Sequence, residues 1–181
     1  MPTDTEREGL TIMKISQLAT LCFTCLLSIM PIAASAQPYV ISKDGSEVTD
    51  QKTGLIWRRC PEGMVFSGAW FSGGACKGTA RAYTHEAALQ QAAAQASSTG
   101  IAWRLPNVKE LSSIADKSFH NPAIDSAAFP ATPSGLFWSA SPNAVYSNYA
   151  GGIDFADGYV SDGYVGDRGS SGYVRLVRTG Q

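Results

Sequence analysis

Histidine and net charge are scarce in this sequence, and each shortage counts against a class of function. The chain of 181 residues contains only two histidines, His85 and His120, and it lacks the Gly-x-Ser-x-Gly elbow of serine hydrolases. Its formal net charge is −1. Nucleic-acid binding would need a basic stripe, and no such stripe stands out. We therefore expect no nucleic-acid partner, and we find no catalytic signature.

The beginning of the chain has the features of a secretory signal peptide. After Met13, Lys14 supplies a positive charge, residues 18–29 are apolar and uncharged, and Ala34-Ser35-Ala36 is a small-x-small cleavage site. An uncleaved membrane anchor is the alternative, but the apolar run is shorter than the ~20 residues that a spanning helix needs. We therefore expect a signal peptide at residues 13–36 and no membrane span after its cleavage.

The expected mature protein is a single domain, residues 37–181. Residues 1–12 are acidic, which is unusual for the start of a signal peptide, so we expect translation to begin at Met13. Export would place the domain in the periplasm, on the cell surface or outside the cell. Its net charge would be near zero, because cleavage removes Asp4, Glu6, Arg7, Glu8 and Lys14.

Two cysteines, Cys60 and Cys76, remain after cleavage. An even number of cysteines in an exported protein indicates a disulfide, which here would close a loop of about 15 residues. A redox or metal-binding pair is the alternative. The spacing is not Cys-x-x-Cys, however, and no histidine lies beside the pair in the sequence to complete a zinc site.

Turn signals near the start of the domain predict a β-hairpin. Residues 46–49 and 55–59 have strand character, and the polar stretch between them ends in Gly54. Residues 60–79 are rich in glycine, so we expect a long irregular loop with Trp70 and Phe71 tucked beneath it.

Thr84 is a suitable N-cap for a helix that ends by Gly100. An alanine stripe along this segment indicates close packing against a neighbour. We expect His85, on the first turn, to be exposed to solvent. The stripe consists of Ala88, Ala92 and Ala96.

The stretch WRLPNVKEL reads as the transition from a strand to a second helix. Residues 101–105, which include Trp103, have strand character, and Pro106 ends them. Asn107 and Glu110 have the spacing of a capping box. Arg104 is the residue without an obvious structural role, and we expect it to bond loop carbonyls. The buried face of the helix should hold Val108, Leu111, Ile114 and Ala115.

Two more strands are expected in the second half of the chain, at residues 136–139 and 173–178. Val174 and Leu176 should lie on one face of the last strand and Val177 on the other. Between these strands, residues 140–172 are rich in tyrosine, aspartate and glycine. The sequence Asp-Gly-Tyr-Val occurs there twice, at 157–160 and 162–165.

Several short motifs follow one another between residues 46 and 178. They are Val48-Thr49-Asp50 with Thr53-Gly54-Leu55-Ile56-Trp57, Trp103-Arg104-Leu105-Pro106-Asn107 with Glu110-Leu111, Phe137-Trp138-Ser139, Ile153-Asp154-Phe155 and Val174-Arg175-Leu176-Val177-Arg178. In this order they resemble the Lcl C-terminal domain family, which is named after the terminal domain of a bacterial collagen-like adhesin.

The resemblance implies an α+β, C-type-lectin-like fold, with two helices packed on small antiparallel sheets and long loops. It also implies binding at a cell surface, although this chain has no collagen-like stalk. Formylglycine-generating enzymes share the broad fold and act through a reactive cysteine pair. Cys60 and Cys76 flank an early loop rather than lying in a late strand, so that chemistry is not expected here.

The late loops are the predicted binding site, because loops held by a rigid scaffold often carry recognition. Their tyrosines offer rigid amphipathic surfaces and their polar residues offer adaptable hydrogen bonds, as in a paratope. The candidate ligand is a glycan or a protein on a cell surface. The candidate residues are Asn143, Tyr146, Asn148, Tyr149, Asp157, Tyr159, Asp162, Tyr164, Asp167 and Arg168.

Three alternatives stay open at this point. Asp157, Asp162 and Asp167 are a candidate calcium site, although their spacing fits no EF-hand loop. The tyrosines could instead be buried by self-association, in a homo-oligomer or as a subunit of a surface appendage or envelope assembly. Finally, two carboxylates brought together by the fold could make a glycan hydrolase.

Overall fold

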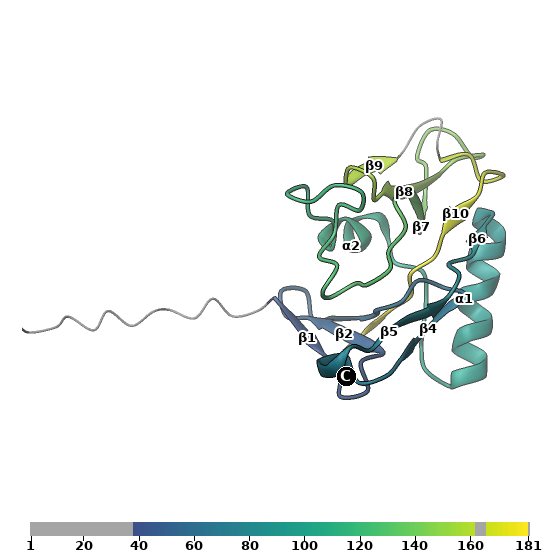
Figure 1. The fold of residues 1–181 in the computed structure, drawn as a ribbon. Coiled ribbons are helices and arrows are strands. Elements are labelled where there is room, and N and C mark those ends of the chain that lie inside the picture. Colours follow the sequence, from purple (N-terminus) through teal and green to yellow (C-terminus); the bar gives the residue numbers. More distant parts are fainter. Residues whose placement is uncertain (1–37, 162–165, 181) are drawn as a thin grey trace, which may run out of the picture. The chain divides into compact units, whose positions relative to one another are not determined.

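The computed structural model describes residues 38–161 and 166–180. The expected extension (1–12) and signal peptide (13–36) lie outside the described residues, as do Asp162 and Tyr164 of the second repeat. Within the described part, two α-helices and three small sheets make up the fold (Figure 1), which confirms the α+β class. The sheets are antiparallel except for one parallel pairing, between β7 (Leu136–Pro142) and β10 (Gly172–Tyr173).

One sheet joins the start of the domain to its end. Its strand order is β1-β2-β3-β11, with β1 at Tyr39–Ile41, β2 at Glu47–Asp50, β3 at Leu55–Arg58 and β11 at Val177–Thr179. The predicted hairpin is confirmed as β2 and β3. Its turn is set by Asp50, whose carboxylate accepts the Lys52 N–H at 2.9 Å and the Thr53 hydroxyl at 2.6 Å. Gly54 then takes a φ of +71°, which glycine adopts without strain.

The expected loop at residues 60–79 is instead a second hairpin. Strands β4 (Met64–Ser67) and β5 (Ala75–Gly78) pair with each other, and a 3-10 turn at Trp70–Ser72 lies between them. Phe71 is 74% exposed, so the expectation that it lies beneath a loop is wrong. The glycines bound the strands and form the turn. The short apolar run Met64-Val65-Phe66, bounded by glycines and containing a β-branched and an aromatic residue, is typical of a strand.

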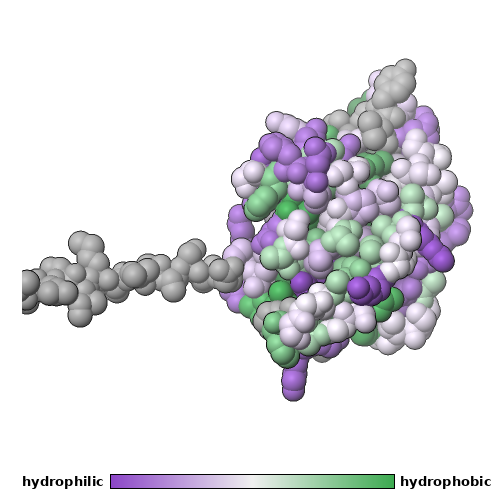
Figure 2. Space-filling view, viewed as in Figure 1, coloured by the Kyte–Doolittle hydropathy of each residue, from purple (hydrophilic) through white to green (hydrophobic). Residues whose placement is uncertain are grey.

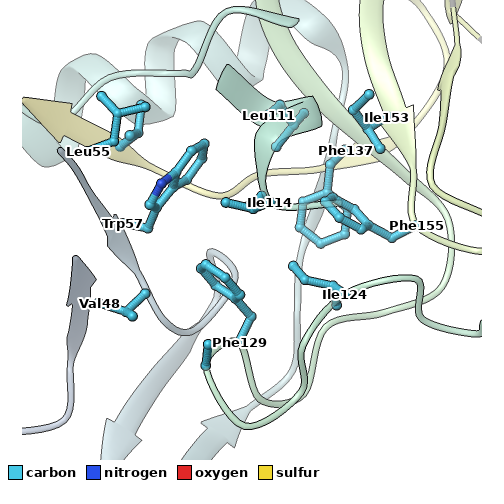
Figure 3. Close-up of a cluster of buried hydrophobic side chains, with 12 residues drawn as sticks. Val48, Leu55, Trp57, Leu111, Ile114, Ile124, Phe129, Phe137, Ile153 and Phe155 are labelled. Atoms are coloured by element: carbon cyan, nitrogen blue, oxygen red, sulfur yellow. The ribbon is translucent and has the colours of Figure 1, made fainter. Parts of the chain in front are cut away.

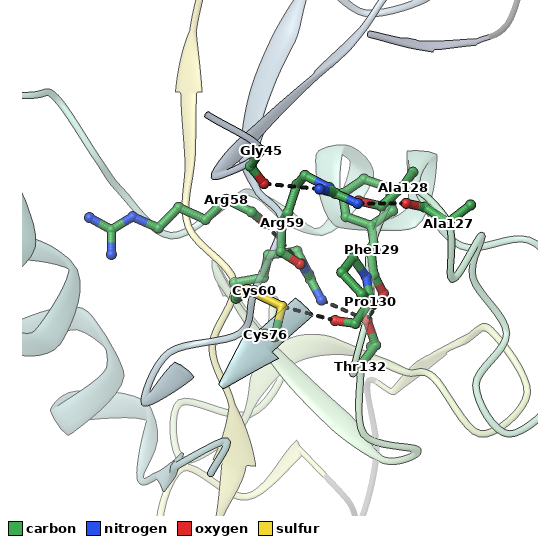
Figure 4. Close-up of a disulfide and its surroundings, with 11 residues drawn as sticks. Gly45, Arg58, Arg59, Cys60, Cys76, Ala127, Ala128, Phe129, Pro130 and Thr132 are labelled. Atoms are coloured by element: carbon green, nitrogen blue, oxygen red, sulfur yellow. Dashed lines mark hydrogen bonds between the residues drawn. A yellow bond between two sulfur atoms is a disulfide. The ribbon is translucent and has the colours of Figure 1, made fainter. Parts of the chain in front are cut away.

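The expected disulfide is present and joins Cys60 to Cys76 of this hairpin (Figure 4). Cys76 lies on β5, opposite Phe66 of β4, whereas Cys60 follows β3. The bond therefore fastens the hairpin to the end of the first sheet. Both cysteines are buried.

The second half of the chain supplies four strands of a five-stranded sheet, and β6 from the first half completes it, in the order β6-β10-β7-β8-β9. Its strands are β6 (Ala82–Tyr83), β10 (Gly172–Tyr173), β7 (Leu136–Pro142), β8 (Ala150–Asp154) and β9 (Tyr159–Ser161). The expected last strand, 173–178, is divided between the two larger sheets as β10 and β11. The prediction that its side chains alternate between two faces is nevertheless confirmed: Val174 and Leu176 lie in one core cluster and Val177 lies in the other.

Helix α1 (His85–Thr99) begins and ends as predicted. The Thr84 hydroxyl accepts the Ala87 N–H, and Gly100 closes the helix with a positive φ. Ala88 and Ala92 are buried against the cluster that contains Trp138 and Leu136, which explains the alanine stripe: small side chains let the helix approach the sheet closely. Ala96, one turn further on, is only half-buried.

Helix α2 (Val108–Ser113) packs on the larger core cluster, in which Leu111, Ile114 and Phe129 meet Trp57 of β3 and Phe137 of β7 (Figure 3). Full burial of each such side chain stabilises the fold by about 1.5–3 kcal/mol. The predicted helix face is confirmed, since Leu111 and Ile114 are buried and Val108 and Ala115 pack against them.

Two buried arginines hold the loop that precedes β7. Arg59 donates to the carbonyls of Gly45, Ala127 and Ala128 (Figure 4). Arg175 is fully buried, and it donates to the backbone carbonyls of Arg58 and Arg59 and to the Thr132 hydroxyl. Burial, reinforced by the nearby charge of Arg59, lowers the pKa of Arg175 to about 9.

Candidate functional site

The WRLPNVKEL segment is part of the scaffold. Asn107 and Glu110 form the predicted capping box: the Asn107 side chain accepts the Glu110 N–H at 2.9 Å, and Glu110 accepts the Asn107 N–H at 2.8 Å. Residues 101–105 do not form the expected strand, since Arg104 makes only a single bridge to Val177. Trp103 is buried, as a structural residue should be.

Arg104 has a structural partner that the sequence analysis missed. Its guanidinium makes two bonds of 2.8 Å to the Glu110 carboxylate, and a third, of 3.2 Å, reaches the Leu105 carbonyl. Bonding to Arg104, together with the Asn107 N–H, holds the pKa of Glu110 below its usual value. The pair therefore reinforces the cap of α2.

The connection between β7 and β8 carries four of the ten predicted binding residues, Asn143, Tyr146, Asn148 and Tyr149. It begins at Asn143, whose side-chain oxygen accepts the N–H groups of Val145 and Tyr146 at 2.8 and 2.9 Å. It closes where the Tyr149 N–H bonds the Tyr146 carbonyl and the Asn143 N–H bonds the Tyr149 carbonyl. Local hydrogen bonds thus fix the backbone of this turn before any ligand is present.

The two tyrosines of the turn lie together and differ in exposure. Their ring centroids are 5.8 Å apart, with an edge-on angle of 65°. Tyr149 is half-buried, whereas Tyr146 is 60% exposed and the adjacent Val145 is 77% exposed. A half-buried ring therefore supports an exposed one, and their edge-on arrangement is favourable for aromatic pairs.

A second segment completes this surface. Asp167 forms an isolated bridge with Tyr149, and the backbone N–H of Arg168 donates to the Asn148 carbonyl. The Arg168 guanidinium also donates to the Tyr149 carbonyl at 3.2 Å. We call this group the tyrosine turn; it consists of Asn143, Tyr146, Asn148, Tyr149, Asp167 and Arg168.

Asp157 and Tyr159 are placed elsewhere. They lie at the turn between β8 and β9, beyond the opposite end of β8 from Tyr149. At about 3.4 Å per residue, the two ends of this five-residue strand are separated by roughly 14 Å. Tyr159 is 59% exposed, and the Lys117 ammonium lies 3.5 Å from the centre of its ring. The predicted site is therefore divided between two places.

The calcium expectation gains no support from the described aspartates. Asp157 accepts the Tyr159 N–H and Asp167 accepts the Gly169 N–H, so each carboxylate stabilises its own turn. Within residues 38–161 and 166–180, no group of three or more His, Cys, Asp or Glu side chains could hold a metal ion. Asp162 lies outside these ranges, so the three-aspartate site stays a prediction.

His85 is buried, so the expectation that it is exposed to solvent is wrong. Its Nε2 lies 2.9 Å from the Ser139 carbonyl, and its ring packs edge-on against Trp138. Burial lowers its pKa, and nearby Arg168 adds to this effect against the opposing hydrogen bond to Ser139. A histidine at a helix start is usually solvated, but this helix begins against the sheet.

The sequence analysis also missed two hollows beside the β4–β5 hairpin, of about 370 and 340 Å³. They were unpredictable because the hairpin itself was interpreted as a loop. Figure 2 shows that polar and apolar side chains are interspersed over the face in view. Among the described residues, no helix is long and apolar enough to cross a membrane.

Comparison with known proteins gives one result that bears on function. The model of the Lcl C-terminal domain family matches residues 46–178, which is most of the chain. No curated protein and no solved structure matches it.

Proposed function

The chain belongs to the Lcl C-terminal domain family, and from this premise we propose that it is a surface-associated binding module that recognises a cell-surface glycan through the tyrosine turn. Family membership suggests surface association. The cysteine pair supports export, because disulfides form and persist in oxidising compartments. The ligand and the site are our inference from the residues.

The observation that carries the proposal is the exposed Tyr146 ring supported by Tyr149. A tyrosine face offers flat apolar area at a low entropic cost, since few rotamers have to be fixed. Asn148 and Arg168 of the same turn carry polar groups. These groups can donate and accept the hydrogen bonds that the hydroxyl groups of a sugar need. A sugar ring, with apolar C–H faces and hydroxyl edges, matches this combination.

The turn is also preorganised for binding. Asn143, Tyr149 and Arg168 tie its backbone to itself and to the segment after β9. A surface that is already ordered loses little conformational entropy when a ligand binds. This matters for weak ligands such as single sugars, which supply little contact energy of their own.

The test is a glycan array probed with residues 37–181, followed by affinity measurements on any glycan that binds. Tyr146→Ala should weaken binding about tenfold or more, which corresponds to 1.4 kcal/mol. Tyr159→Ala is the matched control, because that tyrosine is equally exposed but lies beyond the other end of β8, and it should change affinity less than about twofold. Equal losses in the two variants, or no binding to any glycan, would reject the proposal.

Light scattering distinguishes the main alternative. If Tyr146 is buried by self-association, the wild-type chain should form a dimer or a larger assembly that Tyr146→Ala dissociates. The binding module that we propose should have the same mass in both forms.

A further inference from the structure

A groove runs along the outer edge of β4, apart from the tyrosine turn. The two hollows beside the hairpin share three lining residues, Arg58, Met64 and Val65, and therefore adjoin each other. Each has a volume near the lower limit for small-ligand sites, which is about 300 Å³. We call this feature the hairpin groove.

We propose that the hairpin groove binds an extended peptide, which adds to β4 as a further strand. Within the described part of the chain, β4 pairs only with β5, so its other edge is unpaired. The described residues that line the groove include Met64, Val65 and Phe66 of β4 and none from β5. An edge strand directs alternate N–H and C=O groups outward, and extended peptides bind by pairing with them.

One end of the groove suits an apolar side chain. Phe66, Ile101 and the buried Trp103 line it. Val65 is 72% exposed and Ile101 is 39% exposed, so both offer apolar surface to a ligand at this end. An apolar side chain of a bound strand would cover them.

The other end of the groove carries a positive charge without a carboxylate partner. Glu62 is buried and is already bonded by Arg58 at 3.2 Å and by Gln91 at 2.8 Å. Arg81 is exposed and lies in no ion pair among the described residues. Arg81 interacts with the Tyr83 hydroxyl, and a carboxylate on the peptide would add an ionic partner, with Gln95 beside it as a further hydrogen-bonding group.

The apolar end has the opposite charge balance. Asp44 and Glu47 line it together with Arg58. Glu47 is bonded by Arg178 at 2.6 Å, and Asp44 accepts the hydroxyl groups of two serines, Ser42 and Ser46, each at 2.6 Å. Among the described residues, Asp44 is therefore the carboxylate without an ion-pair partner at this end, and Arg81 is the cation without one at the other end. The groove favours a strand with a basic group at one end, apolar residues in the middle and an acidic group at the other end.

The disulfide makes this groove rigid. Cys60 lies in the wall of the apolar end, and its bond to Cys76 fixes β5, which in turn holds β4. The Glu62 backbone also accepts the Arg81 N–H at 2.9 Å and donates to Val174 at 2.9 Å. Strand addition to such a fixed edge needs ordering of the peptide alone.

The experiment is an NMR titration of residues 37–181 with two capped hexapeptides, lysine-valine-threonine-valine-threonine-glutamate and its reverse, since a strand can add in either direction. At about 1 mM peptide, a concentration that detects binding of roughly 4 kcal/mol, one of them should shift the amide signals of Val65 and Phe66. A version with proline in place of the central threonine and valine should not shift these signals, because proline has no backbone N–H to pair with a strand edge.

Two variants then distinguish recognition of the peptide's charge from nonspecific binding. Arg81→Glu should weaken binding of the peptide about tenfold or more, and it should improve binding of a version with lysine in place of glutamate. Lys109→Glu, an equal change of charge on the exposed side of α2, should leave affinity within about twofold. No signal shift at β4 with either peptide, or equal affinity in Arg81→Glu and wild type, would overturn the proposal.

Discussion

Removing the disulfide is the perturbation with the largest expected effect on stability. Cys60 and Cys76 are 16 positions apart, and their bond holds the β4–β5 hairpin to the end of β3. In the reduced protein, the unfolded chain gains the freedom of this loop, whereas the folded hairpin keeps its strand pairing. We therefore expect the Cys60→Ala/Cys76→Ala double variant to fold with a lower melting temperature.

The magnitude follows from the length of the loop. Closing a loop of about 15 residues removes roughly 10 cal/mol/K of entropy from the unfolded chain, which is about 3 kcal/mol at 25 °C. An unfolding entropy of about 2.1 cal/mol/K per residue, over a domain of about 140 residues, gives roughly 0.3 kcal/mol/K. The melting temperature should therefore fall by about 10 °C.

Circular dichroism during heating measures this shift in residues 37–181. Wild-type protein unfolded in reducing agent is the matched control, because it loses the bond without losing the two buried sulfur atoms. Both samples should melt about 10 °C below the oxidised protein. A fall of less than about 3 °C in both would refute the loop-closure reasoning.

Three smaller changes test the scaffold. Asn107→Ala should cost about 1 kcal/mol of unfolding free energy, because α2 loses its N-cap. Glu110→Gln should flatten the acid side of the plot of unfolding free energy against pH. Bonding to Arg104 lowers the pKa of Glu110 in the folded state. The stability that Glu110 contributes is therefore present above its unfolded pKa and is lost as the pH falls through its folded pKa. Gly152→Ala should cost about 1–3 kcal/mol, because its Cβ would lie 2.6 Å from the Phe137 carbonyl oxygen.

Urea denaturation measures all three changes, each with its own contradicting result. Asn107→Ser keeps a capping oxygen and should recover most of the loss, and equal losses in the two variants would exclude capping. If the unfolding free energy of Glu110→Gln runs parallel to that of wild type between about pH 2 and 5, the ion pair does not contribute to stability. Gly169→Ala is the control for Gly152→Ala: its Cβ would lie 3.2 Å from an oxygen of the Asp167 side chain at an exposed turn, where the side chain can move aside, so this change should cost less than Gly152→Ala.

The local signals of the sequence were reliable where one residue determines one bond. Thr84 and Asn107 identified both helix starts, because a side-chain oxygen at an N-cap satisfies a backbone N–H of the first turn. Asp50 and Gly54 identified the first hairpin for the same kind of reason. The pairing of Cys60 with Cys76 followed from their being the two cysteines after the predicted signal.

Properties that depend on distant partners were not predictable. His85 is buried because its helix begins against Ser139 and Trp138, which lie more than 50 positions away. The candidate binding residues were adjacent in sequence, yet β8 separates Tyr149 from Tyr159. Arg104 bonds the carboxylate of Glu110 as well as a loop carbonyl, and helix spacing could not predict this pair because Arg104 lies before the helix that holds Glu110.

The central claim is that the tyrosine turn is the contact surface and that WRLPNVKEL only holds the frame. An NMR titration of residues 37–181 with the best glycan from the array tests it most directly. We predict that signals of Tyr146, Tyr149 and Arg168 shift while those of Arg104 and Glu110 stay in place. Shifts confined to Arg104 and Glu110, with an unchanged tyrosine turn, would contradict the account.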